Sequence, residues 1–204
     1  PTPEQALKFV EADFALKEAE KTLQDRSNEL GETQEKWERE TNAKPPPKPN
    51  DEGLVAVLSF DDSLVVTSAP AVTAGKMVDA EKPEYADGRL GKALKLDGKA
   101  HADFGPLVSF ERTNAFSYGA WVKLDGDGAV LSKMEKSPGY RGFDLLFADE
   151  RFQVHLVNAW PDDAVKVKTK DKFPKSQWLH VLATYDGSGN ASGVKLYVNG
   201  RNRN

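Results

Sequence analysis

The chain has 204 residues, enough for one ordinary domain with an appendage or for two small domains. Its 28 basic and 32 acidic side chains give a net charge of −4, so neither nucleic acid nor an anionic membrane is favoured as a partner. Because no cysteine is present, disulfides, thiolate metal sites and a cysteine nucleophile are excluded.

The first predicted element is a long α-helix over residues 1–42. Thr2, Pro3 and Gln5 fit an N-cap, a proline in the first turn and the third position of a capping box. Apolar residues then recur every seven positions, at Phe9, Leu16, Leu23, Leu30 and Trp37. The second core position of each heptad changes along the helix from small apolar to polar residues. Only one of the two core positions of a coiled coil is therefore apolar throughout.

Charge is concentrated on this helix, which carries 6 basic and 11 acidic side chains and leaves about +1 for the rest of the chain. Two interpretations stay open for its apolar stripe. The helix packs on its own or a neighbouring domain, or it self-associates as a coiled coil.

A proline-rich linker over residues 43–52 follows, with four prolines that cannot continue a helix. From residue 53 to 204 the pattern changes to short apolar-alternating runs separated by Gly, Asp and Pro. At least seven strands with frequent turn signals predict an antiparallel sandwich, jelly roll or barrel. The runs are LVAVLSF, KALKLDG, FSYGAWVKL, GFDLLF, RFQVHLV, VKVKT, LHVLATY and VKLYVNG.

The run GFDLLFADERFQVHLV, residues 142–157, predicts a hairpin that turns at residues 148–151. Its register pairs Phe147 with Phe152, and it places Asp144 opposite His155 on the other face of the sheet. An acidic group facing a histidine, close to aromatic rings, is typical of a sugar-binding surface, because rings stack on the C–H faces of a sugar while polar groups bind its hydroxyls.

The candidate ligand-binding residues form one expected exposed patch at the end of this hairpin. The alternative is that Asp144 and His155 are an ordinary surface pair and that the aromatic residues only cover the sheet end. The six residues are Tyr140, Arg141, Asp144, His155, Asn158 and Trp160.

Catalysis has little support in the sequence, so no enzyme activity is expected. The three histidines are scattered, without a zinc-binding spacing. No expected strand carries the paired carboxylates that glycoside hydrolysis needs. The LDGDG and YDGSGN groups, at 124–128 and 185–190, could offer oxygens to calcium, but turns alone explain them better.

Several segments taken together resemble a laminin G-like, concanavalin A-like jelly-roll domain over about residues 53–201. They are VAVLSFDDSL, GRLGKALKLDGKAHADFG, AFSYGAWVKLDG, QWLHVLATYDGSG and VKLYVNGR. The resemblance implies a mainly β fold, an antiparallel jelly-roll β-sandwich preceded by the long N-terminal helix. It also implies a glycan or protein ligand, often with calcium. The helix and the strands near GYRGFDLLF are similar to modules of large secreted bacterial proteins that carry c-type cytochrome segments.

Domains of this family continue past the YVNG turn, so the resemblance implies that the chain stops inside its domain. A structural calcium in the family uses carbonyls near the turn Leu96 to Gly98 and a carboxylate from the missing last strand, so this site lacks a ligand. The final hairpin should pair Val181 with Val198 and Ala183 with Leu196. An uncovered edge beside it would favour a homodimer through the edge strand or the helix, cover of the edge by the amino-terminal helix, or marginal stability.

The sequence therefore predicts a non-catalytic carbohydrate- or protein-binding module of a larger secreted bacterial protein. Extracellular or periplasmic localisation, no cofactor and contact with flanking domains of the same long chain go with this prediction. The alternatives are a structural spacer that packs against those flanking domains and, as a third reading, a concanavalin-like glycoside hydrolase.

Overall fold

The computed structural model describes residues 2–42, 51–67 and 72–204. The chain forms two compact units, Pro1–Glu52 and Gly53–Asn204. Most of the predicted proline-rich linker lies outside the described residues.

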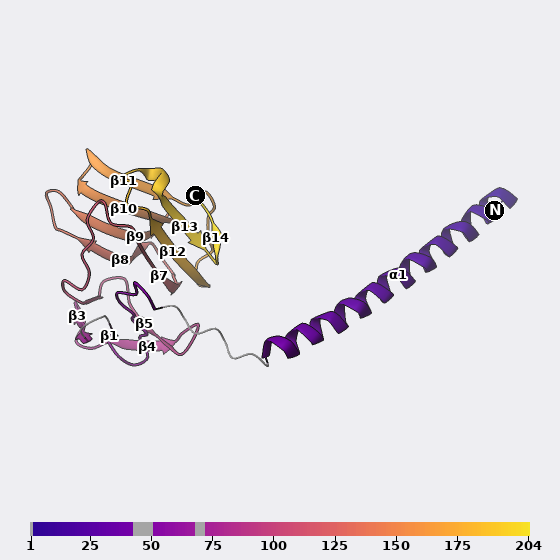
Figure 1. The fold of residues 1–204 in the computed structure, drawn as a ribbon, viewed down its shortest axis with the longest axis horizontal. Coiled ribbons are helices and arrows are strands. Elements are labelled where there is room, and N and C mark those ends of the chain that lie inside the picture. The colour runs from indigo at the N-terminus through magenta and orange to yellow at the C-terminus, as the bar shows by residue number, and fades with distance from the viewer. Residues whose placement is uncertain (1, 43–50, 68–71) are drawn as a thin grey trace. The chain divides into compact units, whose positions relative to one another are not determined.

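The first unit is one unbroken helix, α1 (Pro3–Asn42; Figure 1). The predicted capping box is present, since the Thr2 backbone N–H donates to Gln5 Oε1 at 2.9 Å and the Gln5 N–H donates to Thr2 Oγ1 at 3.3 Å. Gly31 does not interrupt the helix. The side chains of the heptad stripe, from Phe9 to Trp37, are exposed.

The second unit is built from antiparallel strands, and most of them form two four-stranded sheets (Figure 1). The β8–β11 sheet has the order β11-β10-β9-β8, and the β7–β14 sheet has the order β14-β13-β12-β7. Their strands are β7 (Phe116–Lys123), β8 (Gly128–Met134), β9 (Gly142–Ala148), β10 (Arg151–Ala159), β11 (Asp163–Lys168), β12 (Trp178–Tyr185), β13 (Val194–Val198) and β14 (Arg201–Asn202).

The N-terminal part of this unit forms three two-stranded ladders. They are β1 (Val65–Thr67) with β2 (Val72–Ala74), β3 (Lys76–Val78) with β6 (His101–Asp103), and β4 (Glu84–Asp87) with β5 (Lys92–Lys95). A short 3-10 helix, η1 (Ala191–Gly193), precedes β13.

The core lies between the two large sheets. One layer comes from β9 and β10, with Leu145 and Phe152 fully buried, and the other from β12 and β13, with Val181 and Leu196 fully buried. Burial alternates strictly along β12, as expected for a sheet with one face on the core. The molecule is therefore a mainly β, antiparallel sandwich preceded by a long helix, as the sequence predicts.

One predicted strand is wrong. The run LVAVLSF, residues 54–60, has only an isolated bridge at Val57, and Leu54 and Val57 remain exposed. Alternating apolar residues give a segment the propensity for a strand, but a ladder also needs a partner strand along its length. Conversely, the structure contains a strand that the sequence does not predict. This is β8, whose sequence begins inside the Gly-rich LDGDG group.

The final hairpin has the predicted register, with Val181 opposite Val198 and Ala183 opposite Leu196. The residues after it also contact β13. The Arg203 N–H donates to Leu196 O at 2.8 Å, while the Asn204 side chain accepts from Leu196 N and donates to Val194 O, both at 2.6 Å. The backbone edge of β13 that was expected to be uncovered is therefore paired.

Candidate functional site

The β9–β10 hairpin positions the candidate site, and its register is the predicted one. Ala148 pairs with Arg151, which leaves Asp149 and Glu150 as a two-residue turn. Both turn residues have positive φ, 53° and 61°, as a type I′ turn requires. This turn fixes every later pair along the hairpin, including Asp144 opposite His155.

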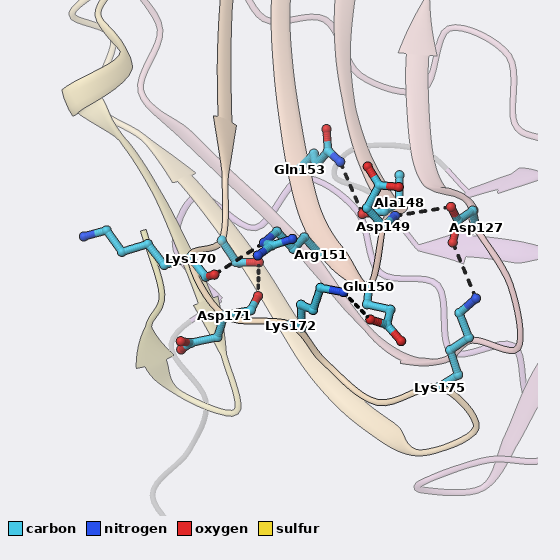
Figure 2. Close-up of polar contacts among 11 residues, drawn as sticks. Asp127, Ala148, Asp149, Glu150, Arg151, Gln153, Lys170, Asp171, Lys172 and Lys175 are labelled. Carbon is cyan, nitrogen blue, oxygen red and sulfur yellow. Dashed lines mark hydrogen bonds and ion pairs between the residues drawn. The ribbon is translucent and has the colours of Figure 1, made fainter.

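Polar contacts hold the turn end of the hairpin in place (Figure 2). The Asp149 N–H donates to Asp127 Oδ2 at 3.2 Å, and Lys172 Nζ lies 2.8 Å from Glu150 Oε2. Lys172 lowers the pKa of the Glu150 carboxyl through this hydrogen bond. Lys175 lies 3.7 Å from Asp127. Three loops are thus joined at the turn, so the charged groups there have a structural role.

Asp144 and His155 form the centre of the candidate site. The imidazole Nδ1 lies 2.9 Å from Asp144 Oδ1 and 3.2 Å from Oδ2, and the His155 backbone N–H also donates to Oδ1 at 3.0 Å. The predicted pair is therefore present. Its expected exposure is wrong, because Asp144 is 4% and His155 9% exposed. The two groups bond each other and Trp160 lies against the imidazole, which withdraws both from solvent.

A polar row crosses the β8–β11 sheet at this level. Ser132, Asp144, His155 and Lys166 stand directly opposite one another on neighbouring strands. Within the described residues, the hydrogen bonds of the His155 side chain involve Nδ1 only. The other ring nitrogen, Nε2, has no partner and is not fully buried. Since the carboxylate fixes Nδ1, the imidazole Nε2 is held in a set direction.

Trp160 lies beside this pair, and Tyr140 precedes β9 at the open end of the same hairpin. The Trp160 ring is perpendicular to the His155 ring, with the centroids 5.8 Å apart, and Trp160 and Tyr140 are each 46% exposed. The backbone N–H of Trp160 donates to Gly139 O at 3.0 Å, which ties the segment before β9 to the turn after β10. The structure thus brings both predicted aromatic residues close to the hairpin end.

The last two predicted residues are each paired with a carboxylate, Arg141 with one in a loop and Asn158 with one at the start of β11. Arg141 Nη2 lies 3.1 Å from Glu111 Oε2, and Asn158 Nδ2 donates to Asp163 Oδ2 at 2.9 Å. Asn158 lies at an irregularity of the β10–β11 ladder, so strand alternation does not describe it. The single patch of six exposed residues is therefore replaced by a buried Asp–His pair with two exposed aromatic rings near it.

Tyr118 supports the site from the opposite sheet. Its hydroxyl donates to the Asp144 backbone oxygen at 2.7 Å. Burial, and secondarily the negative charge of Asp144, raise the pKa of the Tyr118 hydroxyl, so it remains a donor over the physiological range. β9 is thus fixed at the level of Asp144 through both its side chain and its backbone.

Carboxylates in two of the turns that offer oxygens to calcium are engaged in contacts within their own turns. The Asp97 carboxylate accepts the N–H groups of Lys99 and Ala100, both at 2.8 Å, and Asp186 accepts that of Ser188 at 2.9 Å. These are the contacts of turn carboxylates. In the described ranges, no three His, Cys, Asp or Glu side chains gather as metal ligands would.

A second cluster was not predicted from the sequence. On the β7–β14 sheet, Trp121 stands opposite His180 with ring centroids 5.2 Å apart, and Arg89 lies over the Trp121 ring at 5.5 Å. β7 and β12 are distant in sequence, so no hairpin turn gives their register. The only available signal was the outward position of Trp121 in FSYGAWVKL.

Comparison with known proteins bears on the strand unit. Residues 96–204, more than half of the chain, match the family described as the concanavalin A-like lectin/glucanases superfamily. No curated protein and no solved structure matches the chain. Together with the observed sandwich, the family match identifies the chain as a member of the concanavalin A-like lectin/glucanase superfamily.

Proposed function

We propose that the strand unit is a non-catalytic module that binds carbohydrate, with the Asp144–His155 pair and Trp160 at its binding site. The observation that carries this is the exposed indole beside an imidazole whose orientation is fixed by a buried carboxylate. An indole stacks on the C–H face of a sugar ring, while a fixed imidazole Nε2 hydrogen-bonds a hydroxyl.

The distribution of acidic residues supports a role without catalysis. In the described strands of the two large sheets, only Asp144 and Asp163 are acidic. Asp144 bonds His155 and Asp163 accepts from Asn158, so neither is free to act as one of two carboxyl groups across a glycosidic bond.

The setting of the module is also a proposal. We infer a larger secreted bacterial protein, extracellular or periplasmic, in which the module contacts flanking domains and c-type cytochrome segments lie elsewhere in the long chain. Among the described residues, no helix has the length and apolar character to cross a membrane.

A calorimetric titration of the full chain with β-glucan, xylan and galactomannan tests the carbohydrate proposal. At least one of the three should bind without release of reducing ends. Trp160→Ala should weaken that binding about tenfold through loss of stacking. Trp37→Ala is the matched control, because Trp37 is another exposed tryptophan but belongs to the helix unit. The Trp37→Ala variant should bind the polysaccharide as tightly as the parent chain does. Absence of binding to all three, or release of reducing ends, contradicts the proposal.

The second candidate is an interaction or spacer module. The exposed apolar stripe of α1, with Leu16, Leu23 and Leu30, favours it, because such a stripe suits a partner helix or a flanking domain. A homodimer through this helix stays a prediction, for which sedimentation of the full chain over a concentration series is the measurement.

A further inference from the structure

The outward side chains on the strands of the β7–β14 sheet include several aromatic and basic groups and no carboxylate. Its outward positions follow from the strict alternation of burial along β7, β12 and β13. None of these three strands, nor β14, contains Asp or Glu. The outward side chains include Trp121, Lys123, Trp178, His180, Lys195 and Tyr197.

Arg89 is held on this face by an aromatic ring instead of a carboxylate. Its guanidinium carbon lies 5.5 Å from the centroid of Trp121, whose side chain is 44% exposed. Within the described part of the chain, Arg89 has no ion pair and no side-chain hydrogen bond. A cation–π contact positions a guanidinium without using up its N–H donors, so Arg89 keeps them for an anion.

Two further donors surround the same ring. Lys123 is two residues along β7 on the same face, opposite Trp178, and likewise has no ion pair among the described residues. His180 lies directly across from Trp121 on β12. Arg89, Lys123 and His180 thus gather around Trp121. The strands of this sheet contribute no carboxylate to the group, and Asp87 of β4, two residues from Arg89, is paired with Lys92.

We propose that this face is a second binding site, for an acidic polysaccharide, with Arg89 and Lys123 binding its carboxylate or sulfate groups and Trp121 contacting a sugar ring. Charge-assisted bonds from a guanidinium suit either anion, and an indole suits the C–H face of a pyranose. The site is independent of the one at His155, because it lies on the other sheet.

A peptide is less well matched to this face. The backbone groups of β12 are used in its ladders with β7 and β13, so an extended peptide finds no backbone partner at the centre of this face. What the face offers is flat rings and cations at the spacing of a sheet, which suits a chain of charged sugar rings.

Binding of the full chain to polygalacturonate, dextran sulfate, dextran and poly-glutamate tests the proposal. The first arm carries carboxylates and the second sulfates; dextran carries neither, and poly-glutamate supplies negative charge without sugar. We expect at least one acidic polysaccharide to bind more tightly than dextran and poly-glutamate. Arg89→Gln should weaken that binding about tenfold, since bonds to charged groups are lost.

Three variants complete the test. Trp121→Ala should also weaken binding about tenfold. Trp121→Phe keeps an aromatic ring and should bind nearly as well as the parent, which would show that the loss in Trp121→Ala is not caused by misfolding. Lys168→Gln removes an equal charge from the β8–β11 sheet and should change nothing. Equal losses for Arg89→Gln and Lys168→Gln, equal binding of poly-glutamate, or full binding by Trp121→Ala would each overturn the proposal. Trp160→Ala separates this site from the first, because it should leave acidic polysaccharide binding intact.

Discussion

At the residue scale, the candidate site depends on one buried carboxylate. Asp144 accepts from both the imidazole and the backbone N–H of His155, while Tyr118 donates to its backbone oxygen. A buried charge is costly unless hydrogen bonds satisfy it, and here the partners are on a neighbouring strand of the same sheet and on the facing sheet. The hydrogen bonds that offset the cost of burying the Asp144 charge also orient the imidazole of His155.

Removing this carboxylate should therefore destabilise the domain as well as the site. Asp144→Ala should lower the free energy of unfolding by about 2–4 kcal/mol, because it leaves the buried Nδ1 and N–H of His155 without a partner. Ser132→Ala is the control. Ser132 lies opposite Asp144 in the ladder but is exposed, so the change should be within about 0.5 kcal/mol. Urea denaturation measures both, and equal effects of the two substitutions would show that the Asp144 contacts contribute nothing.

At the element scale, the β9–β10 hairpin is positioned by its turn. Asp149 and Glu150 both adopt positive φ, a conformation that is unfavourable for residues with a Cβ atom. Contacts with Asp127 and Lys172 stabilise the turn from outside (Figure 2). Glycine would adopt the same backbone without that steric cost.

Glu150→Gly should consequently raise the thermal unfolding midpoint by a few degrees. The relief at positive φ outweighs the loss of the Lys172 ion pair, because an exposed ion pair contributes little. Glu150→Ala loses the same ion pair but keeps the steric cost, so it should lower the midpoint. If calorimetry finds that both variants lower the midpoint equally, the turn is not limited by its backbone conformation.

The same element shows how far sequence reasoning reaches. The hairpin register followed from a short turn and a period of two, which are local signals, so Phe147 opposite Phe152 and Asp144 opposite His155 were predictable. The burial of Asp144 and His155 was not, because it depends on Trp160 and on neighbouring strands. The Trp121 and His180 contact joins strands about sixty residues apart, and no local pattern specifies such a pairing.

At the scale of the whole molecule, the two units differ in kind. α1 carries its apolar residues on an exposed stripe, whereas the strand unit buries a continuous core between two sheets. Net negative charge belongs to the helix, while the strands of the β7–β14 sheet carry basic side chains and no carboxylate. Both proposed binding sites therefore lie on the sheet faces of the strand unit.

The four tryptophans make this assignment measurable in one experiment, because Trp160 reports on the first site, Trp121 and Trp178 on the second, and Trp37 on the helix unit. Indole N–H signals in a ¹⁵N-correlated NMR spectrum of the full chain, assigned with single Trp→Phe variants, would be followed while the polysaccharides are added. We expect a neutral polysaccharide to shift the Trp160 signal and to leave the Trp37 signal unchanged, and an acidic polysaccharide to shift the Trp121 signal. If no polysaccharide moves Trp160 or Trp121, or if Trp37 alone responds, carbohydrate binding by the strand unit is contradicted.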